Sequence, residues 1–121
     1  MRILLVDDEI SILKTIGKRL EVEGFTVTTA ETGEDALIQA GTDHPDLIVL
    51  DLMLPTINGL NVCQALQQDS QLRRVPVVIF SGKSREDMEA KCLKAGAAAY
   101  VMKGQGASAL VAQIRLILTP S

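Results

Sequence analysis

Aromatic residues are scarce in this sequence, which has one tyrosine, two phenylalanines and no tryptophan among 121 residues. A core of this chain must therefore be built from leucine, isoleucine, valine and alanine, a mixture typical of helices packed over a buried sheet. Apolar residues make up 47% of the chain, which is enough for the core of one domain. We expect residues 1–121 to form one α/β domain, either as a whole protein or excised from a longer chain.

Cysteine and histidine are also rare. Cys63 and Cys92 both fall in helical patterns, which favours reduced core thiols over a disulfide. The single histidine, His44, precedes Pro45 in a loop, where a surface residue or a cation at a helix end is expected. Neither residue type is predicted to take part in a site.

Long apolar runs and clustered positive charge are absent. No run approaches the roughly 20 apolar residues of a membrane span, and the first strand pattern begins without an export leader. The formal net charge is -3 and the 12 basic residues are dispersed, so no footprint for nucleic acid or for an anionic membrane is present. The sequence therefore predicts a soluble cytoplasmic protein that binds neither nucleic acid nor a membrane directly.

What the sequence does contain is a set of apolar runs that each end at a polar residue. They are 2–6 before Asp7 and Asp8, 47–50 before Asp51, 75–80 before Ser81, and 98–102 before Lys103. A buried strand stops at a carboxylate because burying that group unpaired costs several kcal/mol. A single such aspartate can simply begin a turn, but four runs that end alike favour a site. Parallel strands bring these ends to one edge of the sheet.

The segments between the runs have the apolar spacing of helices. In the first, Ile10, Leu13 and Leu20 are expected on the inner face. The other helix signals are the Thr32–Asp35 and Ser84–Asp87 capping boxes, the N-cap Asn58, the C-terminal stops Gly24 and Gly96, and an apolar face over 110–118. A threonine-rich run at 25–30 is typical of an edge strand. Five strand–helix units predict a doubly wound five-stranded parallel sheet with helices on both faces.

Three carboxylates at one edge would repel one another unless a cation neutralised them. Because the expected ligands of Asp7, Asp8 and Asp51 are hard oxygen atoms, Mg²⁺ or Mn²⁺ is favoured over Zn²⁺. Lys103 and the Ser81 hydroxyl can neutralise and hydrogen-bond phosphoryl oxygens. Asp51 is then the natural nucleophile, since carboxylates form aspartyl phosphates.

Four motifs carry a family resemblance. They are Val-Asp-Asp-Glu at 6–9, Asp-Leu-Met-Leu-Pro-x-x-Asn-Gly at 51–59, Phe-Ser-Gly at 80–82, and Gly-Ala-x-x-Tyr-Val-x-Lys at 96–103. In this order and spacing the chain resembles, over essentially its whole length, the CheY-like receiver domain of two-component response regulators. The resemblance implies a flavodoxin-like sheet with strand order 2-1-3-4-5.

The resemblance also implies a mechanism. Asp51 would take a phosphoryl group from a phosphohistidine on a sensor histidine kinase or a histidine phosphotransfer protein. Mg²⁺ would be held by Asp8, Asp51 and the Met53 carbonyl, with Asp7 acting mainly through water. Ser81 would then move toward the phosphoryl group and Tyr100 would rotate inward.

This switch would reshape the surface made by the fourth helix, the fifth strand and the fifth helix, which would signal to a downstream partner or output domain. The protein would be no enzyme beyond its own phosphorylation and dephosphorylation. It is expected to be a monomer or a weak, phosphorylation-dependent dimer.

Three positions depart from the family pattern. Gly104 stands where the family has proline after a cis bond, so we expect a trans Lys103–Gly104 peptide or a remodelled loop. Ala98 and Ala99 replace acidic residues that one subfamily uses in dimer salt bridges. Two residues after Asp51 and Ser81 stand Met53 and Lys83, which should orient water poorly and make autodephosphorylation slow.

Three alternatives remain. A nucleotide-binding flavodoxin-like or Rossmann protein needs glycines in the first strand-to-helix turn, where this chain has acidic residues. A small Mg²⁺-dependent aspartyl-phosphate phosphatase would need a second carboxylate two residues after Asp51. A scaffold that has the site and never uses it is the third.

Overall fold

The computed structural model describes residues 1–82 and 86–119, and only the backbone of residues 86 and 87. Its centre is a parallel five-stranded sheet in the order β2-β1-β3-β4-β5, which confirms the predicted topology. The strands are β1 (Arg2–Val6), β2 (Thr26–Ala30), β3 (Leu47–Leu50), β4 (Val77–Ser81) and β5 (Ala99–Met102). The threonine-rich strand β2 lies at the edge of the sheet, as its composition predicts.

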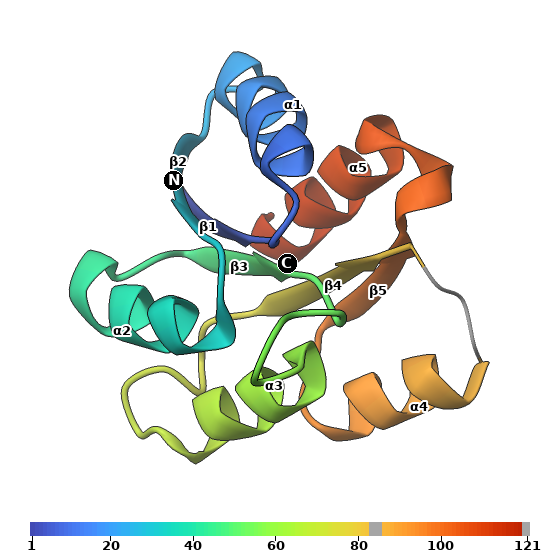
Figure 1. Ribbon diagram of the computed structural model, residues 1–121. Coiled ribbons are helices and arrows are strands. Elements are labelled where there is room, and N and C mark those ends of the chain that lie inside the picture. Colours follow the sequence, from blue (N-terminus) through green and yellow to red (C-terminus); the bar gives the residue numbers. More distant parts are fainter. Residues whose placement is uncertain (83–85, 120–121) are drawn as a thin grey trace.

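Helices cover both faces of the sheet (Figure 1). They are α1 (Ile10–Val22), α2 (Gly33–Asp43), α3 (Gly59–Gln68), α4 (Glu86–Lys94) and α5 (Ala107–Leu118), with a short 3-10 turn η1 (Lys103–Gln105) after β5. Helices α1 and α5 lie on one side of the sheet, and α2, α3 and α4 lie on the other. This is the doubly wound arrangement that alternating strands and helices require.

The core has two halves because the three central strands, β1, β3 and β4, are buried on both faces. In β1, Ile3 and Leu5 join the half under α1 and α5, whereas Leu4 and Val6 join the half over α2, α3 and α4. The thiols of Cys63 and Cys92 are free and buried in the second half, as expected for core cysteines.

The structure shows the predicted N-cap at Asn58 and, of the predicted Thr32–Asp35 capping box, the hydrogen bond to the Thr32 side chain. The Thr32 side chain accepts a hydrogen bond from Asp35 N at 3.0 Å, and Asn58 accepts one from Asn61 N at 2.9 Å. The capping box predicted at Ser84 lies outside the described residues. His44 is the C-cap of α2, in line with its expected place at a helix end.

Four expectations need correction: the place of Ile10 and the first residues of three strands. Ile10 is not on the inner face of α1, because its side chain is 56% exposed. It is the first residue of the helix, next to the end of β1. The fourth strand begins at Val77 instead of 75 and includes Ser81, and the second and fifth strands begin one residue later than expected.

None of the helices in the described part of the chain has the length and apolarity that crossing a bilayer requires.

Candidate functional site

Three carboxylates meet at the carboxyl edge of the sheet. Asp7 and Asp8 follow β1, Asp51 follows β3, and these two strands are paired in register, with Val6 opposite Leu50. One carboxylate oxygen from each aspartate lies within 4.8 Å of the other two. Asp7 and Asp51 are buried, and Asp8 is exposed. The structure therefore brings together the acidic residues that the sequence places at separate strand ends.

Backbone hydrogen bonds hold the two buried aspartates in place. Asp51 N donates to Val6 O at 3.1 Å, and Asp7 N donates to Ala30 O at 3.1 Å, so the sheet ladder extends one residue beyond each strand. Asp51 Oδ1 accepts a hydrogen bond from Met53 N at 3.4 Å. The carboxylates are thus attached to the most rigid part of the fold.

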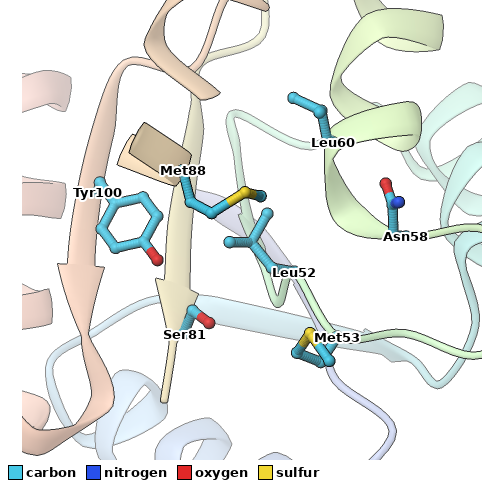
Figure 2. Close-up of a pocket in the computed structure, with 7 residues that line it drawn as sticks. All are labelled: Leu52, Met53, Asn58, Leu60, Ser81, Met88 and Tyr100. Carbon is cyan, nitrogen blue, oxygen red and sulfur yellow. The ribbon is translucent and has the colours of Figure 1, made fainter. Parts of the chain in front are cut away.

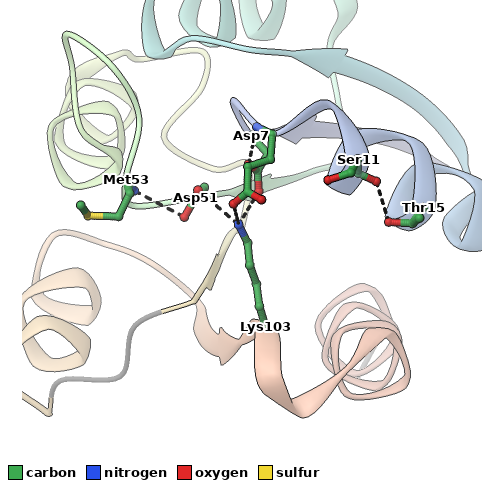
Figure 3. Close-up of polar contacts among 7 residues, drawn as sticks. Asp7, Ser11, Thr15, Asp51, Met53 and Lys103 are labelled. Atoms are coloured by element: carbon green, nitrogen blue, oxygen red, sulfur yellow. Dashed lines mark hydrogen bonds and ion pairs between the residues drawn. The ribbon is translucent and has the colours of Figure 1, made fainter.

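Lys103 reaches the same place from β5, two strands away from β3 (Figure 3). Its Nζ lies 2.8 Å from Asp7 Oδ2 and 3.4 Å from Asp51 Oδ2. It also lies 3.4 Å from Glu9 Oε1. The side chain is only 16% exposed, so its ammonium group is a largely buried counter-ion for the acidic cluster.

Burial and pairing act in opposite directions at this cluster. Burial raises the pKa of Asp7 above its ordinary value, and the hydrogen bonds from Lys103 and Glu9 only partly offset that rise. At Lys103, burial lowers the pKa, but the hydrogen bond to Asp7 and the charges of Asp51 and Asp7 outweigh it and raise the pKa overall. Lys103 is therefore more strongly held in its protonated form, whereas ionisation of Asp7 costs free energy in the folded protein.

The donor set of the cluster fits a hard divalent cation. Its ligand atoms are carboxylate oxygens, and within residues 1–82 and 86–119 no histidine or thiol joins them. Such oxygen atoms suit Mg²⁺ or Mn²⁺ better than Zn²⁺.

Ser81 and Tyr100 lie beside the cluster, at a small cavity. Ser81 is the last residue of β4 and is fully buried, and Tyr100 is in the neighbouring strand β5. The cavity has a volume of about 240 Å³, and Leu52, Met53, Asn58, Leu60 and Met88 complete its lining (Figure 2). Burial raises the pKa of Tyr100, and a side-chain hydrogen bond with Ser81 opposes that rise. The two residues expected to switch are therefore in direct contact.

The loop after Lys103 differs from the family pattern as expected. The described backbone contains no cis peptide bond, so the Lys103–Gly104 peptide is trans. The chain forms the turn η1 here, and the Gln105 side chain accepts a hydrogen bond from Met102 N at 2.9 Å. Of the two positions expected to tune phosphoryl lifetime, the side chain of Met53 is exposed, and Lys83 lies outside the described residues.

Two residues of the site gained no role from the sequence. Glu9 contacts Lys103. The sequence feature that could have drawn attention to Glu9 is its position directly after Asp7 and Asp8. Gly59 packs so closely on the Asp51 backbone that a Cβ atom there would lie 2.4 Å from Asp51 O. A glycine at the start of α3 was visible in the sequence, but the close approach depends on how the loop folds back.

The sheet and its acidic edge place the protein among the flavodoxin-like α/β proteins, which bind ligands at the carboxyl ends of their strands. The family described as the response regulator receiver domain matches residues 3–115. The chain therefore belongs to this family, and it is a CheY-like receiver domain of the response regulators in two-component signalling.

Relatives and solved structures agree with this assignment. The alkaline phosphatase synthesis transcriptional regulatory protein PhoP of Bacillus subtilis (strain 168) is 39% identical over 120 residues, 99% of this chain and 49% of PhoP. The phosphate regulon transcriptional regulatory protein PhoB of Rhizobium meliloti (strain 1021) is 32% identical over 117 residues, 97% of this chain and 52% of PhoB. The chain thus spans about half the length of these relatives.

Among solved structures, the BeF3-activated N-terminal receiver domain of Klebsiella pneumoniae RstA superposes with a TM-score of 0.92 at 26% identity. The match covers 99% of this chain and all of that domain. The CheY-like receiver domain protein of Methanospirillum hungatei JF-1 gives a TM-score of 0.88 at 28% identity, over 97% of this chain and 92% of that one.

Proposed function

We propose that Asp51 is the phosphoacceptor and that it takes a phosphoryl group from a phosphohistidine. The observation that carries this proposal is the position of Lys103 Nζ, 3.4 Å from Asp51 Oδ2 and 2.8 Å from Asp7. Phosphoryl transfer depends chiefly on positioning and on neutralisation of charge, and a buried ammonium beside a carboxylate supplies both.

Mg²⁺ is the proposed cofactor. Asp8, Asp51 and the Met53 carbonyl would hold the ion, and Asp7 would act mainly through water. When bound, the ion neutralises the carboxylates and the phosphoryl oxygens. Lys103 binds a phosphoryl oxygen as a point charge, and the Ser81 hydroxyl donates to another oxygen.

The proposed switch couples Ser81 to Tyr100. Movement of the Ser81 hydroxyl toward a phosphoryl oxygen would break or rearrange its hydrogen bond with Tyr100. The tyrosine would then turn further into the adjoining cavity. The surface of α4, β5 and α5 would change shape with it and be read by a downstream partner or output domain.

The same proposal extends to the domain's location, oligomeric state and partners. Residues 1–121 would act as one receiver domain in the cytoplasm, as a monomer or a weak phosphorylation-dependent dimer. A sensor histidine kinase or a histidine phosphotransfer protein would be the donor. The domain would catalyse only its own phosphorylation and a slow autodephosphorylation, and it would not itself bind nucleic acid or a membrane.

Intact mass after incubation with acetyl phosphate and Mg²⁺ tests the proposal. We expect wild type to gain one phosphoryl group, EDTA to prevent the gain, and Asp51→Asn to abolish it. Asp35→Asn removes the same charge from an exposed position on α2 and should behave as wild type. Continuous release of phosphate with no stable adduct would indicate a phosphatase, and no adduct at all would indicate an unused scaffold.

The lifetime of the adduct tests the expectation of slow autodephosphorylation. Because the Met53 side chain is apolar and exposed, it offers no hydrogen bond to an attacking water. After removal of acetyl phosphate the adduct should persist for minutes or longer. A half-life of a few seconds would refute this part of the proposal.

A further inference from the structure

The side chain of Glu9 has no structural task in the described part of the chain except its contact with Lys103. Glu9 is the N-cap of α1, but its carboxylate makes no capping hydrogen bond there. It is 60% exposed and points instead to Lys103, with Oε1 3.4 Å from Nζ. Its backbone carbonyl accepts the first hydrogen bonds of the helix, from Ile12 N and Leu13 N. The carboxylate can therefore be altered without removing these backbone contacts.

The ammonium group of Lys103 has three N–H donors, and three carboxylates surround it. A phosphoryl oxygen on Asp51 must displace one of these partners. Asp7 is buried and gives the shortest contact, at 2.8 Å, and Asp51 itself carries the incoming group. Glu9 is the most exposed of the three partners, so its contact is the one that is easiest to give up.

We propose that Glu9 competes with the phosphoryl group for Lys103 and thereby slows the loading of Asp51. This inference rests on the proposed function of Asp51 and Lys103. Two effects of Glu9 act in the same direction. Its carboxylate occupies an ammonium donor that the phosphoryl group needs, and its charge repels an anion at the mouth of the site. Glu9 is thus a positioning residue that sets how readily anionic groups enter.

The expected size of the effect follows from the exposure of Glu9. One unit charge several ångströms away, largely in water, changes anion binding by a factor of about three to ten. The effect must also weaken with salt, because the Debye length falls from about 8 Å at physiological ionic strength to about 3 Å at 1 M.

Beryllofluoride is a suitable probe because it occupies the place of a phosphoryl group on a carboxylate without chemical turnover. Its affinity, measured by calorimetry in saturating Mg²⁺, should be about three- to tenfold higher in Glu9→Gln than in wild type. The initial rate of phosphorylation by acetyl phosphate should rise by a similar factor. Both differences should shrink at 1 M salt.

Glu21→Gln is the matched control. It removes the same charge from an exposed position on the same helix, 12 residues away, which is roughly 18 Å along the axis. It should bind beryllofluoride as wild type does. In a Lys103→Gln background, the gain from Glu9→Gln should fall, because the competition for the ammonium group has been removed.

The outcomes separate this inference from the proposed function. If wild type binds beryllofluoride but Glu9→Gln binds it equally or more weakly, the role of Glu9 is refuted while Asp51 remains the acceptor. An equal gain in Glu21→Gln would also refute it, because net charge alone would then explain the effect. If neither wild type nor Glu9→Gln binds the probe or gains a phosphoryl group, the proposed function itself fails.

Discussion

At the scale of single residues, Gly59 constrains the backbone at Asp51, the proposed acceptor. Gly59 begins α3 directly under the loop that follows Asp51, and a Cβ atom there would lie 2.4 Å from Asp51 O and 2.9 Å from Leu52 Cα. Gly59 N also donates to Leu52 O at 2.9 Å. Because the obstructing atoms belong to the backbone, no side-chain rotation can relieve the overlap. Gly59 is thus required for the position of the carboxylate.

Gly59→Ala is therefore expected to lower the free energy of unfolding by about 1 to 3 kcal/mol, through displacement of the loop. Gly41 in α2 is the matched control, since its Cβ position has nothing within 4 Å. Gly41→Ala should instead raise stability by about 0.5 to 1 kcal/mol, because alanine has the higher helix propensity. Urea denaturation measures both values, and an equal effect at the two positions would contradict the packing argument.

The buried charge of Asp7 lowers the stability of the folded state at neutral pH. Its folded-state pKa lies above the ordinary 3.8, so the folded protein binds this proton more tightly than the unfolded chain does. Stability is consequently lost as the pH rises through the raised pKa. Asp7→Asn removes the charge and keeps an oxygen that can accept from Glu9 N, as Oδ1 does at 2.9 Å.

We expect Asp7→Asn to raise the free energy of unfolding in EDTA at pH 7, because it removes a buried charge whose pKa burial raises. The advantage should shrink as the pH falls through the raised pKa and disappear below the ordinary 3.8, where Asp7 is protonated in both the folded and the unfolded state. Urea denaturation at pH 7 and at low pH tests this. A variant that is less stable than wild type at pH 7 would show that the ion pair with Lys103 outweighs burial.

At the scale of elements, a charged cluster ties α1 to α5 on the far side of the sheet from the cavity. Glu23 Oε2 lies 3.1 Å from Arg19 Nε, and Glu23 Oε1 lies 2.9 Å from Arg115 Nη2. The guanidinium of Arg115 also lies over the ring of Phe25, 5.4 Å from its centroid. These contacts join the end of α1 to the last turns of α5.

The hydrogen bonds from Arg115 and then Arg19 lower the pKa of Glu23 below its ordinary 4.5. Its contribution to stability is therefore present above about pH 4.5 and is lost as the pH falls through the lowered pKa. Glu23→Gln should slightly lower the thermal midpoint at pH 7 and low salt, and the difference should vanish in acid or high salt. A difference that persists under both conditions would mean that the side chain acts by packing.

Features of helices that depend only on residues nearby in the sequence, such as N-caps, could be predicted. The caps Thr32 and Asn58 were correct because a cap bonds to a backbone N–H only three residues away. Ile10 was placed wrongly because apolar spacing describes a helix face and says nothing about where the sheet under it ends. The contact of Glu9 with Lys103 was not predicted, because the strand pattern locates the strand ends but does not determine which way the Glu9 side chain points.

At the scale of the whole molecule, strand order explains why distant residues share one site. Parallel pairing of β1 with β3 places Asp7 and Asp51 side by side, and Lys103 spans the distance from β5. The sequence predicted this convergence because four of the five strand runs ended at a polar group and parallel strands joined by right-handed crossovers bring those ends to one edge. The distances and the burial of each group depended on packing and required the structure.

The proposed Mg²⁺ site at these carboxylates would make stability depend on the cation. Binding to the folded carboxylates at ten times the dissociation constant should stabilise the protein by about 1.4 kcal/mol. We expect Mg²⁺ to raise the denaturation midpoint relative to EDTA, and Asp8→Asn to reduce this rise. An unchanged midpoint in millimolar Mg²⁺ would argue against a metal site at Asp7, Asp8 and Asp51.

We propose that the convergence makes Asp51 alone the carrier of phosphorus. Borohydride reduction after treatment with acetyl phosphate and Mg²⁺ converts a phosphorylated aspartate to homoserine, and peptide mass spectrometry then locates it. We expect homoserine at position 51 and unmodified aspartate at positions 7 and 8. Homoserine at either of those positions, or none in a folded protein, would contradict this proposal.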